Sequence, residues 1–182
     1  MNVTYCELSY IQKQENKGGE SMKWEDKIFA EKALKRLLIG SQIDGVRFGS
    51  ESGMVYIYFA HYSEQDPGII WLLIEIKKVT VFANLEQLKT ASKENLKELD
   101  DKESFQLFLE NRREKVKDVW LGSESPHLCI LLESGKVLYV NGEDENYECW
   151  QIGDGYGYVE DEWLVVAVPG NAIAVWSPEE FK

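Results

Sequence analysis

The chain is short of the residues from which most metal and redox sites are built. Among 182 residues it has three cysteines, Cys6, Cys129 and Cys149, and two histidines, His61 and His127. Three scattered cysteines cannot form the disulfide framework of a small secreted protein, which favours a reducing compartment. A zinc site needs three or four ligands at close spacing, and the sequence has no such cluster. We therefore expect no metal and no cofactor.

Long apolar runs are also missing. The longest runs from Gly68 to Ile76 and contains Glu75, so it falls short of the roughly 18 residues that cross a bilayer as a helix. The N-terminus has no basic segment followed by an apolar core, as a secretory signal would have. We expect a cytoplasmic protein without membrane contacts.

Catalytic motifs are absent as well. No GxSxG sequence occurs, and neither histidine stands beside a Gly-flanked Ser or Cys. The glycine-rich stretch at 153–157 lacks the Lys-Ser/Thr of a phosphate loop and favours a turn. We predict no catalytic residue. A carboxylate pair leaves a small hydrolase open as an alternative, with Glu145, Glu148, Asp154 and Asp161 as its candidates.

The residues that are present predict one globular domain over 1–182, because 44% are hydrophobic and 12% aromatic. Residues 118–177 read as a β-meander in which Val, Ile, Leu, Tyr and Trp alternate with turn signals. Those signals are Gly135-Lys136, Asn141-Gly142, Gly153-Asp154-Gly155 and Pro169-Gly170-Asn171. Three tryptophans in this region are expected in the core, namely Trp150, Trp163 and Trp176.

Helical periods mark two other regions. Residues 22–38 place apolar side chains at steps of three and four, with Ser21 as N-cap and Gly40 as the stop. Residues 84–117 predict a helical hairpin, which begins with a capping box of Asn84 and Gln87 and restarts at Asp100.

Between and before these helices, residues 43–83 predict β-hairpins and residues 1–21 an N-terminal arm. A weak internal echo, in which two apolar residues and Gly-Ser precede a hairpin at both Gly40 and Gly122, would fit a duplicated β unit. The predicted fold class is α+β: a mainly antiparallel β-sheet with an N-terminal helix and a central helical hairpin on one face.

The charge of the chain is uneven. Formal net charge is −12, and residues 141–182 hold ten acidic residues against Lys182 alone. Such a field repels nucleic acid and attracts basic proteins, while neighbouring aromatic residues supply buried contact. Solvated turns would give the same composition. The predicted partner-binding residues are Glu143, Asp144, Glu145, Tyr147, Asp154, Tyr156, Tyr158, Glu160, Asp161 and Glu162.

The C-terminal third also resembles a known type of protein. The residues that carry the resemblance lie between Leu121 and Ser177: Tyr147-Glu148-x-Trp150-x-Ile152-Gly153, Leu164-Val165-Val166, and Pro169-Gly170-x-x-Ile173-Ala174-Val175-Trp176. They resemble small bacterial domains of unknown function of the immunity-protein type, which accompany polymorphic toxins. The resemblance covers about a third of the chain and carries no functional residue with it.

Charge and resemblance together favour a non-enzymatic, acidic binding protein. We expect an immunity or inhibitor protein that covers the active surface of a basic toxin or nucleic-acid-binding effector. A small hydrolase that uses the C-terminal carboxylates and a phage-encoded inhibitor of a host defence protein are the alternatives, besides a housekeeping module without a charged partner.

Overall fold

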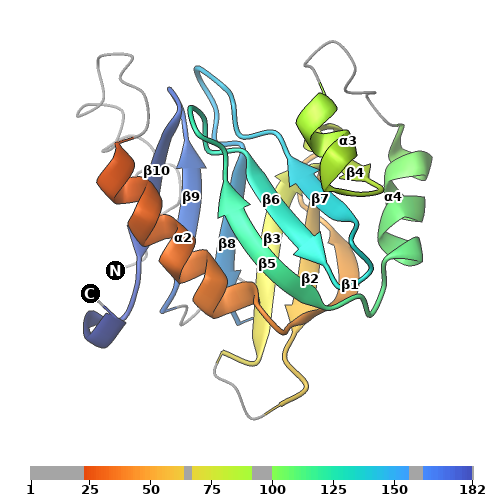
Figure 1. The fold of residues 1–182 in the computed structure, drawn as a ribbon, viewed down its shortest axis with the longest axis horizontal. Coiled ribbons are helices and arrows are strands. Elements are labelled where there is room, and N and C mark those ends of the chain that lie inside the picture. Colours follow the sequence, from red (N-terminus) through yellow and green to blue (C-terminus); the bar gives the residue numbers. More distant parts are fainter. Residues whose placement is uncertain (1–22, 64–66, 92–99, 156–161, 182) are drawn as a thin grey trace.

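The computed structural model describes residues 23–63, 67–91, 100–155 and 162–181. The described strands form two antiparallel sheets (Figure 1). The six-stranded sheet has the order β1 (Gln42–Phe48), β2 (Met54–Ala60), β3 (Ile69–Glu75), β8 (Trp150–Asp154), β9 (Leu164–Val168) and β10 (Ala172–Trp176). The four-stranded sheet has the order β4 (Val79–Phe82), β7 (Val137–Val140), β6 (Leu128–Leu132) and β5 (Val116–Leu121).

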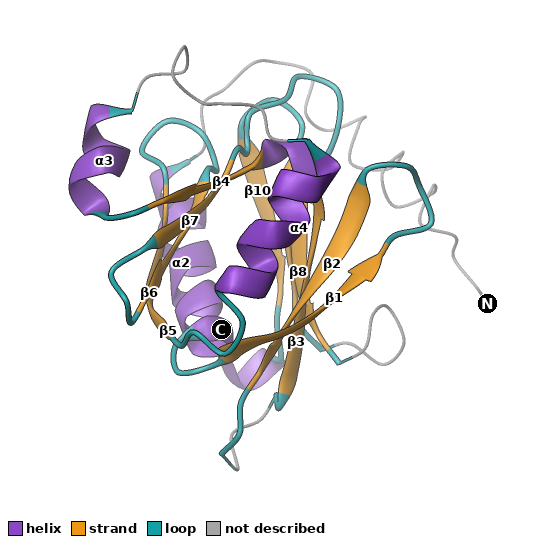
Figure 2. Cartoon of the chain, turned by 90° about the vertical axis from the view of Figure 1, so that its right-hand side faces the viewer, coloured by secondary structure: helices purple, strands orange, loops and turns teal. Residues whose placement is uncertain are grey.

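The two sheets face each other, and the helices close the gaps at their sides. Figure 2 shows the sheets nearly edge-on, with α4 (Asp101–Glu110) across one opening between them. On the other side, α2 (Trp24–Leu38) packs against β5 of the smaller sheet and against β9 and β10 of the larger one. The predicted α+β class with mainly antiparallel strands is confirmed, but the strands are divided between two sheets.

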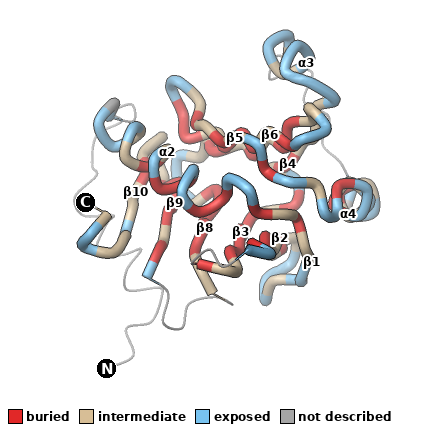
Figure 3. Tube along the Cα trace, turned by 60° about the horizontal axis from the view of Figure 1, so that its bottom comes forward, coloured by how far each residue is buried: buried red, intermediate tan, exposed pale blue. Residues whose placement is uncertain are grey.

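One continuous core lies between these layers (Figure 3). Along β3, Ile70, Leu72 and Ile74 point into it and are fully buried. Burying a side chain of this size stabilises the fold by about 1.5–3 kcal/mol. β3 is a central strand of its sheet, because it pairs with β2 on one side and with β8 on the other.

The N-terminal helix is confirmed as α2. Its buried face consists of Ala30, Ala33, Leu34, Leu37 and Leu38, and the chain leaves the helix at Gly40, whose φ of 86° favours glycine. Two details differ from the prediction. Ile28, expected on the apolar face, is half exposed; Lys23 occupies the N-cap without a side-chain bond, whereas Ser21 lies outside the described residues.

The helical region after β4 is shorter than predicted. It holds α3 (Leu85–Thr90) and α4, which ends at Glu110 instead of near 117. Arg113 then adopts a positive φ of 67°, which breaks the helical path. Val116 belongs to β5, where it alternates into the core with Val119 and Leu121.

The predicted N-caps of these helices are observed. The Asn84 side chain accepts from Gln87 N–H at 3.0 Å, although the Gln87 side chain bonds Ala83 instead of closing a reciprocal box. Asp100 and Glu103 do form a reciprocal capping box at the start of α4. For α4, local polar patterning therefore predicted the start of the helix better than its end.

The C-terminal third has the predicted strands but not the predicted single meander. β6 and β7 form a hairpin in the four-stranded sheet, whereas β8, β9 and β10 lie in the six-stranded sheet. Positive φ angles at Gly135 and at Gly170-Asn171 confirm two of the predicted turns. The segment between β7 and β8 carries the chain from one sheet to the other.

Two further expectations depend on the chain's first half. The predicted arm at residues 1–21 lies outside the described residues. Hairpins do turn at Gly53 and Gly135, but they lie in different sheets. The step at Gly40 follows the end of helix α2, whereas the step at Gly122 follows the end of strand β5. The topology therefore does not support a duplicated unit.

Candidate functional site

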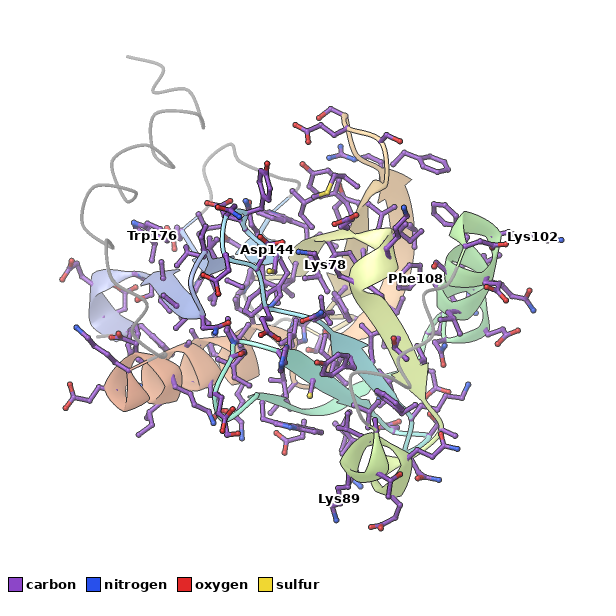
Figure 4. The ribbon with its side chains drawn as sticks, turned by 90° about the horizontal axis from the view of Figure 1, so that it is seen from above. Lys78, Lys89, Lys102, Phe108, Asp144 and Trp176 are labelled. Atoms are coloured by element: carbon purple, nitrogen blue, oxygen red, sulfur yellow. The ribbon has the colours of Figure 1, made fainter. Side chains whose placement is uncertain are left out.

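The acidic loop, defined as residues 141–148, connects β7 of the smaller sheet to β8 of the larger one. It contains four of the predicted partner-binding residues: Glu143, Asp144, Glu145 and Tyr147. Figure 4 shows Lys78, from the short helix η1 (Ile76–Lys78), beside Asp144 of this loop. The loop's shape follows from that contact and from backbone hydrogen bonds around it.

Asp144 holds the loop from inside. Its carboxylate accepts hydrogen bonds from Lys78 Nζ at 3.0 Å, Asn146 N–H at 3.0 Å and Tyr147 N–H at 3.1 Å. Its backbone carbonyl accepts from Gly170 N–H at 2.9 Å, in the turn between β9 and β10. Asp144 thus supports the loop, and its carboxylate is already engaged.

The two ends of the loop are fixed as well. Asn141 N–H donates to the Lys78 carbonyl at 2.8 Å, and Cys149 N–H donates to a carbonyl of β9 at 3.0 Å. Gly142 N–H donates to Nδ1 of His127 at 3.0 Å. Gly142 is buried so tightly that a Cβ there would lie 2.1 Å from the Pro126 carbonyl oxygen, so this position requires glycine.

The electrostatics of the support agree with its geometry. The hydrogen bond from Asn146 N–H, aided by Lys78, lowers the pKa of Asp144. Burial acts to lower the pKa of Lys78, but Asp144 and Cys149 outweigh it and raise that pKa. Both partners are therefore ionised at neutral pH, with side chains 17% and 26% exposed.

Around this support, three consecutive residues, Glu145, Asn146 and Tyr147, are exposed to solvent. Tyr147 is 73% exposed, although its backbone is tied to Asp144, and Glu145 is exposed beside it. Glu143 is partly exposed and has interactions of its own. An aromatic ring and a carboxylate thus stand on a fixed backbone.

The other predicted residues divide into two groups. Asp154 closes the end of β8, because its carboxylate accepts from Trp163 N–H and its carbonyl from Trp71 Nε1, each at 2.9 Å. Glu162 is exposed. Four predicted residues lie outside the described residues: Tyr156, Tyr158, Glu160 and Asp161.

The tryptophans follow the core prediction in two of three cases. Trp150 and Trp163 are buried, and Trp150 Nε1 donates to the Pro126 carbonyl at 2.7 Å. Trp176, expected in the core, is instead 43% exposed at the end of the edge strand β10. Its position in the last residue of an outer strand, where no further strand covers it among the described residues, explains the difference.

The last residue of the acidic loop, Glu148, has a carboxyl whose pKa is shifted in the opposite direction from that of Asp144. Burial raises the pKa of Glu148, against the hydrogen bond that its carboxylate accepts from Gln151 Nε2. Burial also raises the pKa of Cys129 to about 12, so this thiol stays protonated. Within the described ranges, no three His, Cys, Asp or Glu side chains are grouped as metal ligands.

Sequence reasoning missed Lys78, the cation that fixes the acidic loop. Lys77-Lys78 stood out only as a charged pair between apolar runs. Lys78 and Asp144 are 66 positions apart in the sequence, and local sequence patterns do not predict a contact between residues so far apart.

The chain was also compared with known proteins. No protein-family model, curated protein or solved structure matches it. Separately, none of the helices in the described part of the chain is long and apolar enough to cross a membrane.

Proposed function

We propose that this protein is a non-enzymatic binding protein whose acidic loop captures a basic protein partner. Its role would be that of an immunity or inhibitor protein, which covers the positive surface of a toxin or of a nucleic-acid-binding effector. The proposal rests mainly on one observation: the acidic loop holds Tyr147 73% exposed on a backbone fixed by Asp144.

A fixed loop favours binding because little conformational entropy remains to be lost when the partner docks. Tyr147 is the type of residue that dominates binding energy at protein interfaces, since its ring buries a large area with few rotatable bonds. An exposed tyrosine on an unsupported loop would bring a larger entropic cost. The bonds to Asp144 therefore support a role in recognition.

Charge supports the same partner class. Glu145 stands beside Tyr147, and ten acidic residues lie between 141 and 182. A concentrated negative field accelerates the approach of a positive surface and orients it before contact. Proteins that act on nucleic acids carry such positive surfaces, because they must bind phosphate.

Affinity capture from lysate of the host, at low salt, tests the proposal. Two baits are compared: the wild-type chain and a Tyr147→Ala/Glu145→Gln variant, both of which should fold because the two side chains project into solvent. We expect a basic protein on the wild-type bait that moderate salt releases and that the variant bait loses.

A matched bait carrying Tyr62→Ala serves as the control. Tyr62 is also exposed, at 69%, and lies just after β2, where its hydroxyl donates a hydrogen bond to Asp44 of β1. It should capture the same protein as the wild type. Capture of no basic protein, or equal capture by all three baits, would contradict the proposal.

A second candidate function follows from Glu148. A half-buried carboxyl with a raised pKa is suited to general acid catalysis, as in the small hydrolase that the carboxylates first suggested. Hydrolysis of a small-molecule or glycoside substrate that Glu148→Gln abolishes, while Glu145→Gln leaves it intact, would favour this function over partner capture.

A further inference from the structure

The six-stranded sheet has an edge that stays open beyond its first residues. At its start, β1 is bonded to the segment before β5: Ile43 N–H donates to the Glu114 carbonyl, and the Ile43 carbonyl accepts from Arg113 N–H. From Val46 to Phe48, β1 pairs with β2 only, among the described residues. This open segment is called the β1 edge here.

The register fixes which backbone groups face outward. Gly49 N–H donates to Met54 across the hairpin, so by alternation Arg47 bonds to Tyr56, whereas Val46 and Phe48 form the non-bonded pairs. The N–H and C=O groups of Val46 and Phe48 therefore point away from β2, toward the open side. They form the template that an added strand needs.

Apolar side chains surround the same edge. Phe48 is 74% exposed and Val46 is 37% exposed, although both lie on the face of β1 that meets the core farther along the sheet. On α4, Leu109 is 74% exposed, and Phe105 contacts the Phe48 ring edge-on at 4.9 Å between centroids. Exposed apolar groups of this size beside an open strand mark an interaction surface.

α4 runs antiparallel to β1. Phe105 lies at the level of Phe48, while Arg113 lies at the level of Ile43. Leu109, halfway between Phe105 and Arg113, is consequently at the level of the middle of β1. The β1 edge and α4 thus form one surface.

This surface differs in charge from the rest of the chain. Residues 42–48 hold one acidic and one basic residue, and residues 101–115 hold four of each. Both segments are neutral in a protein of net charge −12. Two copies that approach through other acidic faces repel each other, whereas this face lets them meet without that cost.

We propose that the β1 edge binds the β1 edge of a second copy, antiparallel, in a two-fold symmetric dimer. Outward groups must meet outward groups, and a β-bulge between Ile43 and Gly45 ends the regular alternation, so the pairing is formed by Val46 and Phe48 alone. Val46 of one copy lies opposite Phe48 of the other, about a two-fold axis at Arg47. The two six-stranded sheets become one continuous sheet. The inference is independent of the acidic loop and of the function proposed for it.

This register brings complementary groups together at both ends. Phe48 of the second copy lies at the level of Val46, near the middle of β1, and covers Leu109, so that the two most exposed apolar side chains of the surface bury each other. Beyond it, Glu51 of the second copy comes to the level of Arg113. Glu51 lines a cleft of about 340 Å³ with Phe48 and Phe105, which gives the arginine room to enter.

Sedimentation equilibrium on the full chain tests the dimer. The wild type should shift from 21.0 kDa toward twice that mass as its concentration rises. Val46→Pro should stay monomeric, because proline lacks the outward N–H but is tolerated on an open edge. The matched variant Val46→Thr keeps that N–H and should dimerise, and unchanged circular dichroism would show that all three fold.

Charge exchange tests the register. Glu51→Arg alone and Arg113→Glu alone should each weaken the dimer at least fivefold, because each places like charges together, while the double variant should restore it. A wild type that stays monomeric to millimolar concentration would overturn the proposal. A dimer that Val46→Pro leaves intact, or one that the double exchange fails to restore, would overturn it equally.

Discussion

The acidic loop and the β1 edge use charge in opposite ways. In the loop, the Asp144 carboxylate binds Lys78 and the loop backbone, whereas Glu145 and Tyr147 are exposed to solvent. Along the β1 edge, charges cancel and apolar side chains such as Phe48 are left open. A strongly charged surface selects an oppositely charged partner, whereas a neutral apolar surface admits a second copy of the same chain. One fold can therefore offer two contacts that do not compete.

The largest expected effect is on stability, and it distinguishes Asp144, which supports the acidic loop, from Glu145, which is available to contact a partner. Asp144→Ala should lower the free energy of unfolding by about 2 kcal/mol, because it leaves Lys78 as a partly buried cation and frees two N–H groups. Glu145→Ala, one residue on, should change it by less than about 0.5 kcal/mol. Urea denaturation of both variants measures the difference, and equal losses would contradict the supporting role of Asp144.

Removal of the exposed ring should weaken binding without loss of stability. Tyr147→Ala should reduce affinity for the captured basic partner about 30-fold, or about 2 kcal/mol, as loss of an interface tyrosine does. Calorimetric titration gives the affinity, with Phe48→Ala at the β1 edge as the comparison. An equal loss in the Phe48 variant would show that the two surfaces are not separate.

Charge should act mainly on the rate of association. Replacement of Glu160, Asp161 and Glu162 together by Gln should slow association with the basic partner at least tenfold at low salt, and the difference should shrink as salt is added. Stopped-flow measurement at several ionic strengths checks this. The account predicts no effect of the same variant on the dimer, and an unchanged association rate would refute the steering role.

The smallest effect concerns pH. Burial raises the pKa of Glu148 in the folded chain. The protonated side chain therefore stabilises the fold fully at a pH below the ordinary glutamate pKa, and this stabilisation is lost as the pH rises through the raised pKa. Glu148→Gln should therefore raise Tm by about 1 °C at pH 7 and leave it unchanged at pH 4. Thermal unfolding at the two pH values measures this, and a stabilisation that is the same at both would be inconsistent with a buried carboxylate.

Much of the fold could be predicted from local pattern. The buried strand β3, the glycine stop after α2 and the capping box of Asp100 all depend on residues close together in sequence. The division of the strands into two sheets could not be read in this way. It depends on two connections between the sheets, η1 after β3 and the acidic loop after β7. A hydrogen bond between Lys78 and Asp144, 66 positions apart, joins these two connections.

Local sequence patterns were also insufficient to predict the roles of residues in the candidate site. Composition predicted that the loops after β7 and β8 are acidic, but it could not separate Asp144, which is engaged, from Glu145, which is free. The β1 edge was missed because its exposed Phe48 follows the same alternation as a buried strand residue. Its exposure depends on how far the opposing sheet extends, and that is a property of the whole fold.

Zero-length cross-linking shows whether the basic partner docks on the acidic loop. A carbodiimide joins carboxylates to lysines in contact, and mass spectrometry of the purified complex locates each link. We expect links from partner lysines to Glu145 and Glu162. Links confined to Glu51 and Glu110, at the β1–α4 surface, would contradict it.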